Sequence, residues 1–236
     1  MTMSRVVEPE LLDTLAPDDP RAVRSRADLR RINRLMGTRT LLGRPLDALL
    51  AGAPPTRVVE LGAGDGTLLL QLGQSPGRQW PGISLGLLDL HPVVSTRTLA
   101  GYRALGWDAE VIQADVFAWL AHEAVEAPAA RPLVLANLFV HHFQGPRLQQ
   151  LLAGIAARAR AFICVEPCRS PLALLGSRLL GAIGCNDVTR HDAVTSVRAG
   201  FSGQELSALW PDPGAWSLEE GAAGLFSHRF LAVRKP

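Results

Sequence analysis

A glycine-rich turn between two apolar segments constrains this chain more than any other feature of its sequence. Residues 57–61 form an apolar run typical of a buried strand, and a helical pattern begins at Leu68. Between them stand Gly62, Gly64 and Gly66, which let the backbone turn sharply and let a ligand approach it closely. The start of a helix also offers unpaired N–H groups. The pattern therefore predicts a strand, a turn and a helix that together bind a nucleotide-like ligand.

The spacing of the glycines separates two classes of cofactor. A dinucleotide fingerprint, G-x-G-x-x-G/A, needs glycine or alanine where this chain has Thr67. Here Glu60 precedes a G-x-G-x-G series, and this arrangement resembles motif I of the class I S-adenosylmethionine (SAM)-dependent methyltransferases. A tight turn in an ordinary α/β domain is the alternative. The resemblance implies SAM as cofactor, with contacts from Glu60, Gly62, Ala63, Gly64 and Gly66.

Strand-like and helical patterns alternate after the first strand. The apolar runs lie at 57–61, 83–90, 109–114, 132–139 and 161–166, and the helical patterns at 66–73, 93–105, 116–124 and 146–159. This order is typical of a Rossmann-like, doubly wound α/β fold with a mostly parallel sheet. Two final runs, at 215–219 and 225–233, resemble the reversed strand pair that closes a class I methyltransferase sheet.

The chain divides into two parts around the first strand. Residues 1–52 are expected to form a loose lead-in of about 20 residues and a helical cap, with helices at 21–36 and 40–51. Residues 53–236 are expected to form the SAM-binding methyltransferase domain. Within it, an apolar helix pair at about 170–184 and a polar loop at 185–203 predict an acceptor lid near 170–203.

Acidic residues end the second and third predicted strands, where ligands bind in open α/β sheets. Asp89 can accept hydrogen bonds from ribose hydroxyls, although it could instead cap the next helix. The resemblance implies that Asp115 recognises the adenine amino group while the next backbone N–H reaches the ring; Asp115 could also cap its helix. The expected cofactor contacts at these two ends are Asp89, Leu90, Asp115 and Val116.

The fourth predicted strand delivers an asparagine and two histidines to the same edge. Asn137, His141 and His142 resemble the corresponding segment of small-molecule methyltransferases related to the ubiquinone and menaquinone biosynthesis enzymes. No proline follows Asn137, so the segment does not resemble that of enzymes that methylate adenine or glutamine amides. The resemblance covers residues 57–166 well and implies that Asn137 contacts SAM.

Histidine is the usual base near neutral pH when a hydroxyl acceptor must lose its proton. His142 and His141 are the candidates, and His191 in the predicted lid is a rival. One histidine could instead serve only for packing or capping. An acceptor that is already anionic, or an activated carbon, needs no base.

Composition limits the partners. The net charge of +2 makes nucleic acid an improbable target, although eight arginines between residues 21 and 44 keep an RNA-binding face open. The odd number of cysteines, with no C-x-x-C pair, indicates reduced thiols in a cytoplasm. No apolar run reaches the ~18 residues of a membrane span. No metal site is expected, because the cysteines lack ligand spacing and no carboxylates cluster in the sequence.

These features predict a SAM-dependent methyltransferase that acts on a small apolar or aromatic acceptor. O-methylation of a phenolic or polyketide-like metabolite fits the resemblance and the apolar segment 172–183. Three alternatives stay open: a tRNA or rRNA methyltransferase, a non-catalytic SAM-fold binding protein, and, least favoured because of Thr67, an NAD-dependent oxidoreductase.

Overall fold

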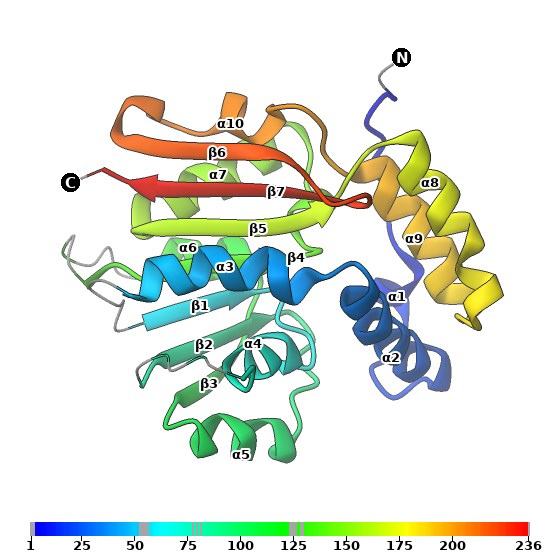
Figure 1. Ribbon diagram of the computed structural model, residues 1–236, viewed down its shortest axis with the longest axis horizontal. Coiled ribbons are helices and arrows are strands. Elements are labelled where there is room, and N and C mark those ends of the chain that lie inside the picture. The colour runs from blue at the N-terminus through cyan, green and yellow to red at the C-terminus, as the bar shows by residue number, and fades with distance from the viewer. Residues whose placement is uncertain are drawn as a thin grey trace.

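A computed structural model describes residues 3–51, 57–76, 78, 80, 82–122, 127 and 130–235 (Figure 1). Its strands are β1 (Arg57–Leu61), β2 (Ser84–Asp89), β3 (Asp108–Gln113), β4 (Leu133–Asn137), β5 (Ala161–Pro167), β6 (Trp216–Ala223) and β7 (Ser227–Arg234). They form one sheet in the order β3-β2-β1-β4-β5-β7-β6. Strands β1 to β5 are parallel, and β7 runs antiparallel to β5 and β6. The predicted Rossmann-like sheet and its reversed strand pair are confirmed.

The strand order reverses at β1, whose neighbours are β2 and β4. Leu61 at the end of β1 pairs with Leu88 on one side and with Ala136 on the other. The carboxyl ends of these three strands therefore lie side by side. In parallel α/β sheets this is the place where ligands bind.

Helices cover both faces of the sheet (Figure 1). One apolar core lies under α3 (Thr38–Ala51), α4 (Thr67–Gly73) and α5 (Thr96–Ala104). The other lies under α6 (Val116–His122), α7 (Gly145–Arg158) and α10 (Glu205–Leu209). Alternation along β1 divides its side chains between the two cores: Val58 belongs to the first and Val59 to the second.

Of the two helices expected in the cap, only α2 (Pro20–Leu35) lies there. Helix α3 packs on the sheet, because its apolar positions Leu42, Leu46 and Leu50 are buried in the first core. The assignment of residues 40–51 to the cap was therefore wrong. The expected domain boundary between residues 52 and 53 lies outside the described residues.

The region expected as a lid contains more helix than its sequence indicated. Helix α8 (Pro171–Arg178) continues into a 3-10 turn, η3 (Leu179–Ile183), and α9 (Asp187–Ala199) follows. The prediction of a loop at 185–203 was wrong. The polar residues that suggested a loop are used inside the fold: Asn186 caps α9, and Thr189 donates to the buried Asp28 of α2. Further 3-10 turns are η2 (Val140–His142) and η4 (Pro213–Ala215).

The N-terminal segment is not a loose lead-in. The Val6 amide donates to Arg198 O at 3.1 Å, and Arg5 Nε donates to Ala199 O at 2.7 Å. The short helix α1 (Leu11–Thr14) then begins on the carboxylate of Asp192, which accepts from Leu11 N and Leu12 N at 2.8 and 2.9 Å. Residues 3–14 are thus held along α9 by specific hydrogen bonds.

Candidate functional site

The glycine turn has the backbone that its sequence demands. Gly62, Gly64 and Gly66 have φ values of 67°, 54° and 66°, a region that side chains with a Cβ rarely adopt. A Cβ added to Gly64 would meet no atom within 4 Å, so open space adjoins the turn there. Tyr102 Oη donates to Gly66 O at 2.6 Å, and Gly66 N donates to Ala63 O. The turn is therefore a preformed cradle beside open space.

Asp89 ties this cradle to the end of β2. Its carboxylate accepts from Gly64 N and from His91 N, both at 2.8 Å. Ser95, and not Asp89, caps the helix α5 that follows. Leu90, next to Asp89, has 54% of its surface exposed. An acid and an exposed leucine thus adjoin the cradle.

Two buried acceptor atoms near the cradle lack a hydrogen-bond partner within the described part of the chain. They are Oε2 of Glu60, at the end of β1, and Oδ1 of Asn137, at the end of the neighbouring β4. Burial, with smaller contributions from Asp65 and Asp89, raises the pKa of Glu60 to about 8. Native proteins rarely leave such atoms unpaired. A donor such as the ammonium group of an amino-acid-like ligand would satisfy either atom.

Asp115 performs the capping role that its position allowed. Its Oδ1 accepts from Phe117 N and Ala118 N at 2.9 and 3.1 Å, at the start of α6. Val116 beside it is buried. Capping occupies one carboxylate oxygen, so this geometry is compatible with a contact to adenine as well.

His141 lies in the interior, between two carboxylates. Its Nδ1 is 2.7 Å from Glu166 Oε2, and its Nε2 is 3.2 Å from Glu10 Oε1. Burial opposes a charge on the ring, but the two carboxylates outweigh it and raise the pKa of His141 to about 9. With both nitrogens engaged and a raised pKa, His141 does not have the geometry of a free base.

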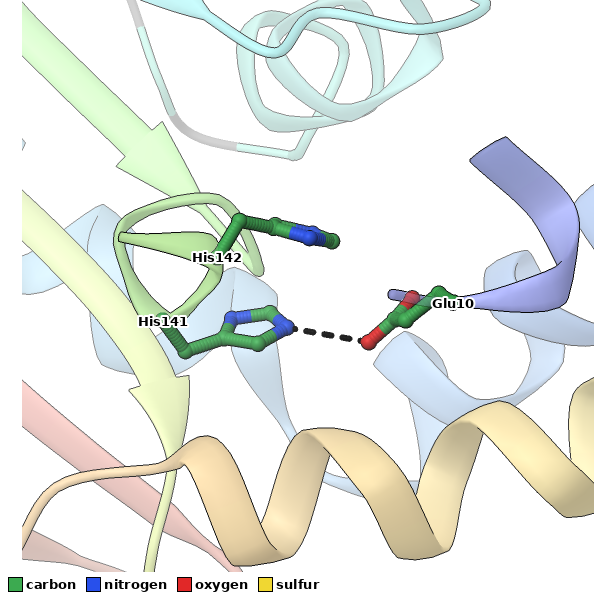
Figure 2. A group of neighbouring side chains, drawn as sticks. All are labelled: Glu10, His141 and His142. Carbon is green, nitrogen blue, oxygen red and sulfur yellow. Dashed lines mark hydrogen bonds and ion pairs between the residues drawn. The ribbon is translucent and has the colours of Figure 1, made fainter. Parts of the chain in front are cut away.

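His142 is the more exposed of the pair, with 26% of its side chain accessible. Its ring centroid lies 4.3 Å from that of His141, and its Nδ1 is 3.5 Å from Asp13 Oδ2. Burial and the positive charge on His141 lower the pKa of His142. Figure 2 shows both rings and the Glu10 carboxylate turned toward one another, and we call these three residues the histidine–glutamate cluster.

Glu10 comes from the N-terminal segment and was not anticipated from the sequence. Ser196 Oγ of α9 donates to its Oε1, the oxygen that also faces His141. Burial alone would raise the pKa of Glu10, but its hydrogen bond to His141 and the charges of His141 and His142 outweigh burial and lower it. Arg5 holds the same region together, since its guanidinium donates to His141 O and Phe143 O at 3.0 and 2.9 Å.

His191 stands apart from this cluster. Its side chain is 52% exposed on α9, and its Nδ1 lies 3.0 Å from Asp192 Oδ1. Asp192, Ala193 and Ser196 of the same helix line the cavity described next, whereas His191 does not. The structure thus brings two of the three candidate histidines together and leaves the third on the surface.

A cavity of about 180 Å³ lies beside the cluster. It is enclosed mainly by apolar side chains of α2, α8 and α9, with Glu10 and Leu12 from the N-terminal segment and Leu138 from the end of β4. An apolar cavity of about 150 Å³ can hold benzene, so this one matches a single substituted ring. Leu138 has φ of 53°, an uncommon value for leucine that is often found at functional sites.

Helix α2 contacts the cofactor side as well as the cavity. Arg30 forms an ion pair with Asp65 of the glycine turn at 2.6 Å, and Asn137 Nδ2 donates to Asn33 Oδ1 at 3.3 Å. Arg31 pairs with the buried Asp28 at 3.3 Å. Part of the positive charge that suggested an RNA-binding face is therefore paired within the chain.

No protein-family model matches the sequence, and no curated protein is significantly similar to it. Within the described residues, no helix is both long and apolar enough to cross a bilayer.

Solved structures share the fold at low sequence identity. The plantazolicin methyltransferase BamL, in complex with a triazolic desmethylPZN analog and SAH, is 14% identical with a TM-score of 0.62, and the match covers 93% of each chain. An O-methyltransferase family protein from Burkholderia thailandensis is 17% identical with a TM-score of 0.61, over 91% of this chain and 59% of that one. For the pyocyanin biosynthetic protein PhzM the identity is 16% and the TM-score 0.58, over 96% and 62%.

This chain thus spans less than two thirds of two of these proteins and nearly all of BamL. In this chain the sheet order is β3-β2-β1-β4-β5-β7-β6, with a reversed terminal strand pair and a glycine turn at the carboxyl end of β1. The chain has the fold of the class I SAM-dependent methyltransferases.

Proposed function

We propose that this chain transfers the methyl group of SAM to a small, mainly apolar acceptor, by O-methylation of a phenolic or polyketide-like compound. The observation that carries the proposal is the meeting of cradle and cavity at the end of β4. Asn137 contributes an unpaired acceptor beside the glycine turn, and the next residue, Leu138, lines the apolar cavity. The two places are therefore contributed by adjacent residues, and methyl transfer requires the acceptor and SAM to be aligned at such a junction.

The residues around the cradle fit SAM. Its ammonium group suits the two unpaired acceptors, Glu60 Oε2 and Asn137 Oδ1, and the open space at Gly64 lets a ligand approach the backbone. We assign the ribose hydroxyls to Asp89, and the adenine to Leu90, Asp115 and Val116. SAM supplies an activated methyl group on a sulfonium, so the protein mainly aligns acceptor and donor.

We propose the histidine–glutamate cluster as the catalytic centre. It is the polar end of a largely apolar cavity, because Glu10 both lines the cavity and contacts His141. A hydroxyl acceptor loses its proton on methylation. The cluster can take up that proton or stabilise the negative charge that it leaves on the acceptor oxygen. His191 has no part in the proposal, since it is exposed and its ring nitrogen faces Asp192 and not the cluster.

We further propose a cytoplasmic location, supported by three free cysteines and by the absence of a spanning helix from the described residues. Paired arginines on α2 and the mainly apolar cavity favour a small molecule over RNA.

Calorimetry with SAM, S-adenosylhomocysteine and NAD, followed by methyl-transfer assays on single-ring phenols, tests the proposal. We expect SAM to bind, and we expect His141→Ala with His142→Ala to lower turnover at least about tenfold while SAM still binds. His191→Ala is the matched control and should keep full turnover. Binding of NAD without SAM would overturn the proposal. SAM binding without transfer to any acceptor would favour a non-catalytic protein. Strongly salt-dependent RNA binding would favour a nucleic-acid methyltransferase.

A further inference from the structure

The histidine–glutamate cluster has the composition of a metal site. Glu10 supplies a carboxylate oxygen and His141 and His142 each supply a ring nitrogen, and these atoms all lie within 4.8 Å of one another. Around a metal ion with bonds of about 2.0–2.2 Å, ligand atoms in adjacent positions lie roughly 3.0–3.5 Å apart. The 3.2 Å between His141 Nε2 and Glu10 Oε1 already has this value.

Each of the three ligand side chains also has a further polar partner. Glu166 bonds Nδ1 of His141 at 2.7 Å, Asp13 faces Nδ1 of His142 at 3.5 Å, and Ser196 donates to Glu10. Carboxylates that orient metal-bound histidines in this way are general in metalloproteins. Glu166 is itself buried and accepts three backbone N–H groups, so the ring of His141 is rigidly aimed.

The charge around the cluster favours a cation. Three carboxylates, from Glu10, Asp13 and Glu166, lie within 3.5 Å of the two imidazole rings. A fourth, Asp192, also lines the cavity that Glu10 lines. Arg5, which donates to His141 O, offsets part of this negative charge, and a divalent ion would balance the rest.

We propose that Glu10, His141 and His142 bind one divalent transition-metal ion of the Zn²⁺ type. Two imidazoles and one carboxylate suit Zn²⁺, Fe²⁺, Co²⁺ or Ni²⁺ better than Mg²⁺ or Ca²⁺, which prefer oxygen ligands. Three protein ligands leave at least one position for water or substrate, as in catalytic rather than structural sites.

The catalytic consequence rests on the proposed function. An acceptor hydroxyl bound in the open position would lose its proton to solvent and remain as a metal-bound oxygen anion. That oxygen would form the new bond to the methyl carbon while the carbon–sulfur bond breaks and its electron pair stays on sulfur. The cluster would thus promote deprotonation of the acceptor hydroxyl through metal coordination, in place of a free histidine base.

The test uses the full chain, stripped with a chelator and then titrated with ZnCl₂ by calorimetry, with metal content read by mass spectrometry. We expect one Zn²⁺ per chain. Glu10→Gln and His142→Ala should each weaken binding at least about tenfold, and Glu166→Gln about 10–100-fold. His191→Ala is the matched control, because that imidazole also lies beside a carboxylate but has no third ligand. It should bind Zn²⁺ as the wild type does.

SAM binding is measured on the same samples, together with circular dichroism to verify folding. Wild-type protein that binds SAM but no Zn²⁺ overturns the metal site and leaves the proposed function intact. Zn²⁺ binding that is unchanged by both Glu10→Gln and His142→Ala overturns the assignment of ligands. Zn²⁺ binding that follows these variants, in a chain that binds no SAM, supports the site and refutes the methyltransferase proposal.

Discussion

The proposed cofactor side and the proposed acceptor side of this molecule are built in different ways. The cradle around Gly62, Gly64 and Gly66 is formed by one continuous turn, and Asp89, which supports it, lies 25 residues from the Gly64 amide that it holds. The acceptor side joins segments from both ends of the chain: Ser196 and Glu10, which bond each other, are 186 residues apart. A local turn can be recognised from residue types, whereas a site made of distant segments exists only after the chain has folded.

The two sides also differ in what holds them. Backbone conformation shapes the cradle, so glycine and its φ angles are decisive there. Buried charges shape the acceptor side, where the carboxylate of Glu166 fixes both the η2 backbone and His141. Changes to charge should therefore damage the acceptor side most, and changes to backbone freedom the cofactor side.

The largest effect is expected for Glu166→Ala. This change leaves three backbone N–H groups and a charged imidazole without their buried partner, and removal of one member of a buried pair costs about 3–5 kcal/mol of unfolding free energy. Urea unfolding measures the loss. SAM affinity of the protein that remains folded should change little, because Glu166 does not touch the cradle.

Glu220→Ala is the matched control for this prediction. Glu220 also bonds a buried histidine, His228, at 2.8 Å and accepts from Leu206 N and Ser207 N, but it lies between β6, β7 and α10. A similar stability loss is expected, with methyl transfer retained per folded molecule. Equal loss of transfer in both variants would mean that Glu166 acts only through general stability.

The next prediction compares the stability losses caused by alanine at two glycines of the cradle. Gly62→Ala introduces both a strained φ and a clash, because its Cβ would lie 2.5 Å from the ring of Phe139. We expect the free energy of unfolding to fall by about 2–4 kcal/mol. Gly64→Ala adds only the strain, about 1–2 kcal/mol, because open space surrounds it. Thermal unfolding with and without SAM checks this order.

Both alanine variants should also weaken SAM binding. Relative to its loss of unfolding free energy, Gly64→Ala should lose more SAM affinity than Gly62→Ala does, because its new methyl group enters the open space beside the turn. If Gly64→Ala is as destabilising as Gly62→Ala, the space at Gly64 is filled in solution and the cradle is not preformed.

This contrast explains which features were predictable. Glycine spacing, strand alternation and acids at strand ends are local, and they correctly predicted the sheet, the turn and the cap at Asp115. The histidine pair was found for the same reason, because both residues follow one apolar strand. Their protonation and partners were not predictable, since these depend on Glu10 and Glu166 from other segments.

The wrong predictions concern segments whose polar side chains bond other parts of the chain. Residues 185–203 resembled a loop because Asn186, Thr189 and Asp192 are polar, yet each bonds another segment of the fold. Residues 3–14 resembled a loose lead-in because residues 1–20 are polar and contain three prolines, yet Glu10 and Arg5 bond distant segments. Composition alone cannot distinguish a polar side chain that faces water from one that meets a distant partner.

A pH-dependent effect is expected from Glu60, again on the proposed cofactor side. Its pKa of about 8 lies above the unfolded value of 4.5, so the folded chain keeps a proton that the unfolded chain releases. Stability should therefore fall as pH rises between these values, by up to about 1.4 kcal/mol per pH unit. Glu60→Gln removes this slope, and urea unfolding of both proteins at several pH values in this window measures the difference. Parallel curves for the two proteins would show that Glu60 is not buried in solution.

The smallest effect is expected where the two sides meet, at the ion pair between Arg30 of α2 and Asp65 of the glycine turn. The two side chains are 43% and 23% exposed, and exposed pairs contribute about 0.2–1 kcal/mol. Asp65 also accepts from the amide and hydroxyl of Thr67, so the turn should keep its shape in Arg30→Ala. Unfolding free energy should change by less than about 1 kcal/mol, and SAM should dissociate up to about fivefold faster because α2 is less firmly held over the turn.

Arg21→Ala is the matched control for this pair. Arg21 is on the same helix and bonds Asp19, which lies away from the cradle, so its loss should leave SAM dissociation unchanged. High salt should bring the wild type close to Arg30→Ala, because salt screens exposed pairs. If Arg30→Ala instead abolishes SAM binding, helix α2 is part of the cofactor site itself, and the separation between a locally built cofactor side and a distantly assembled acceptor side does not hold.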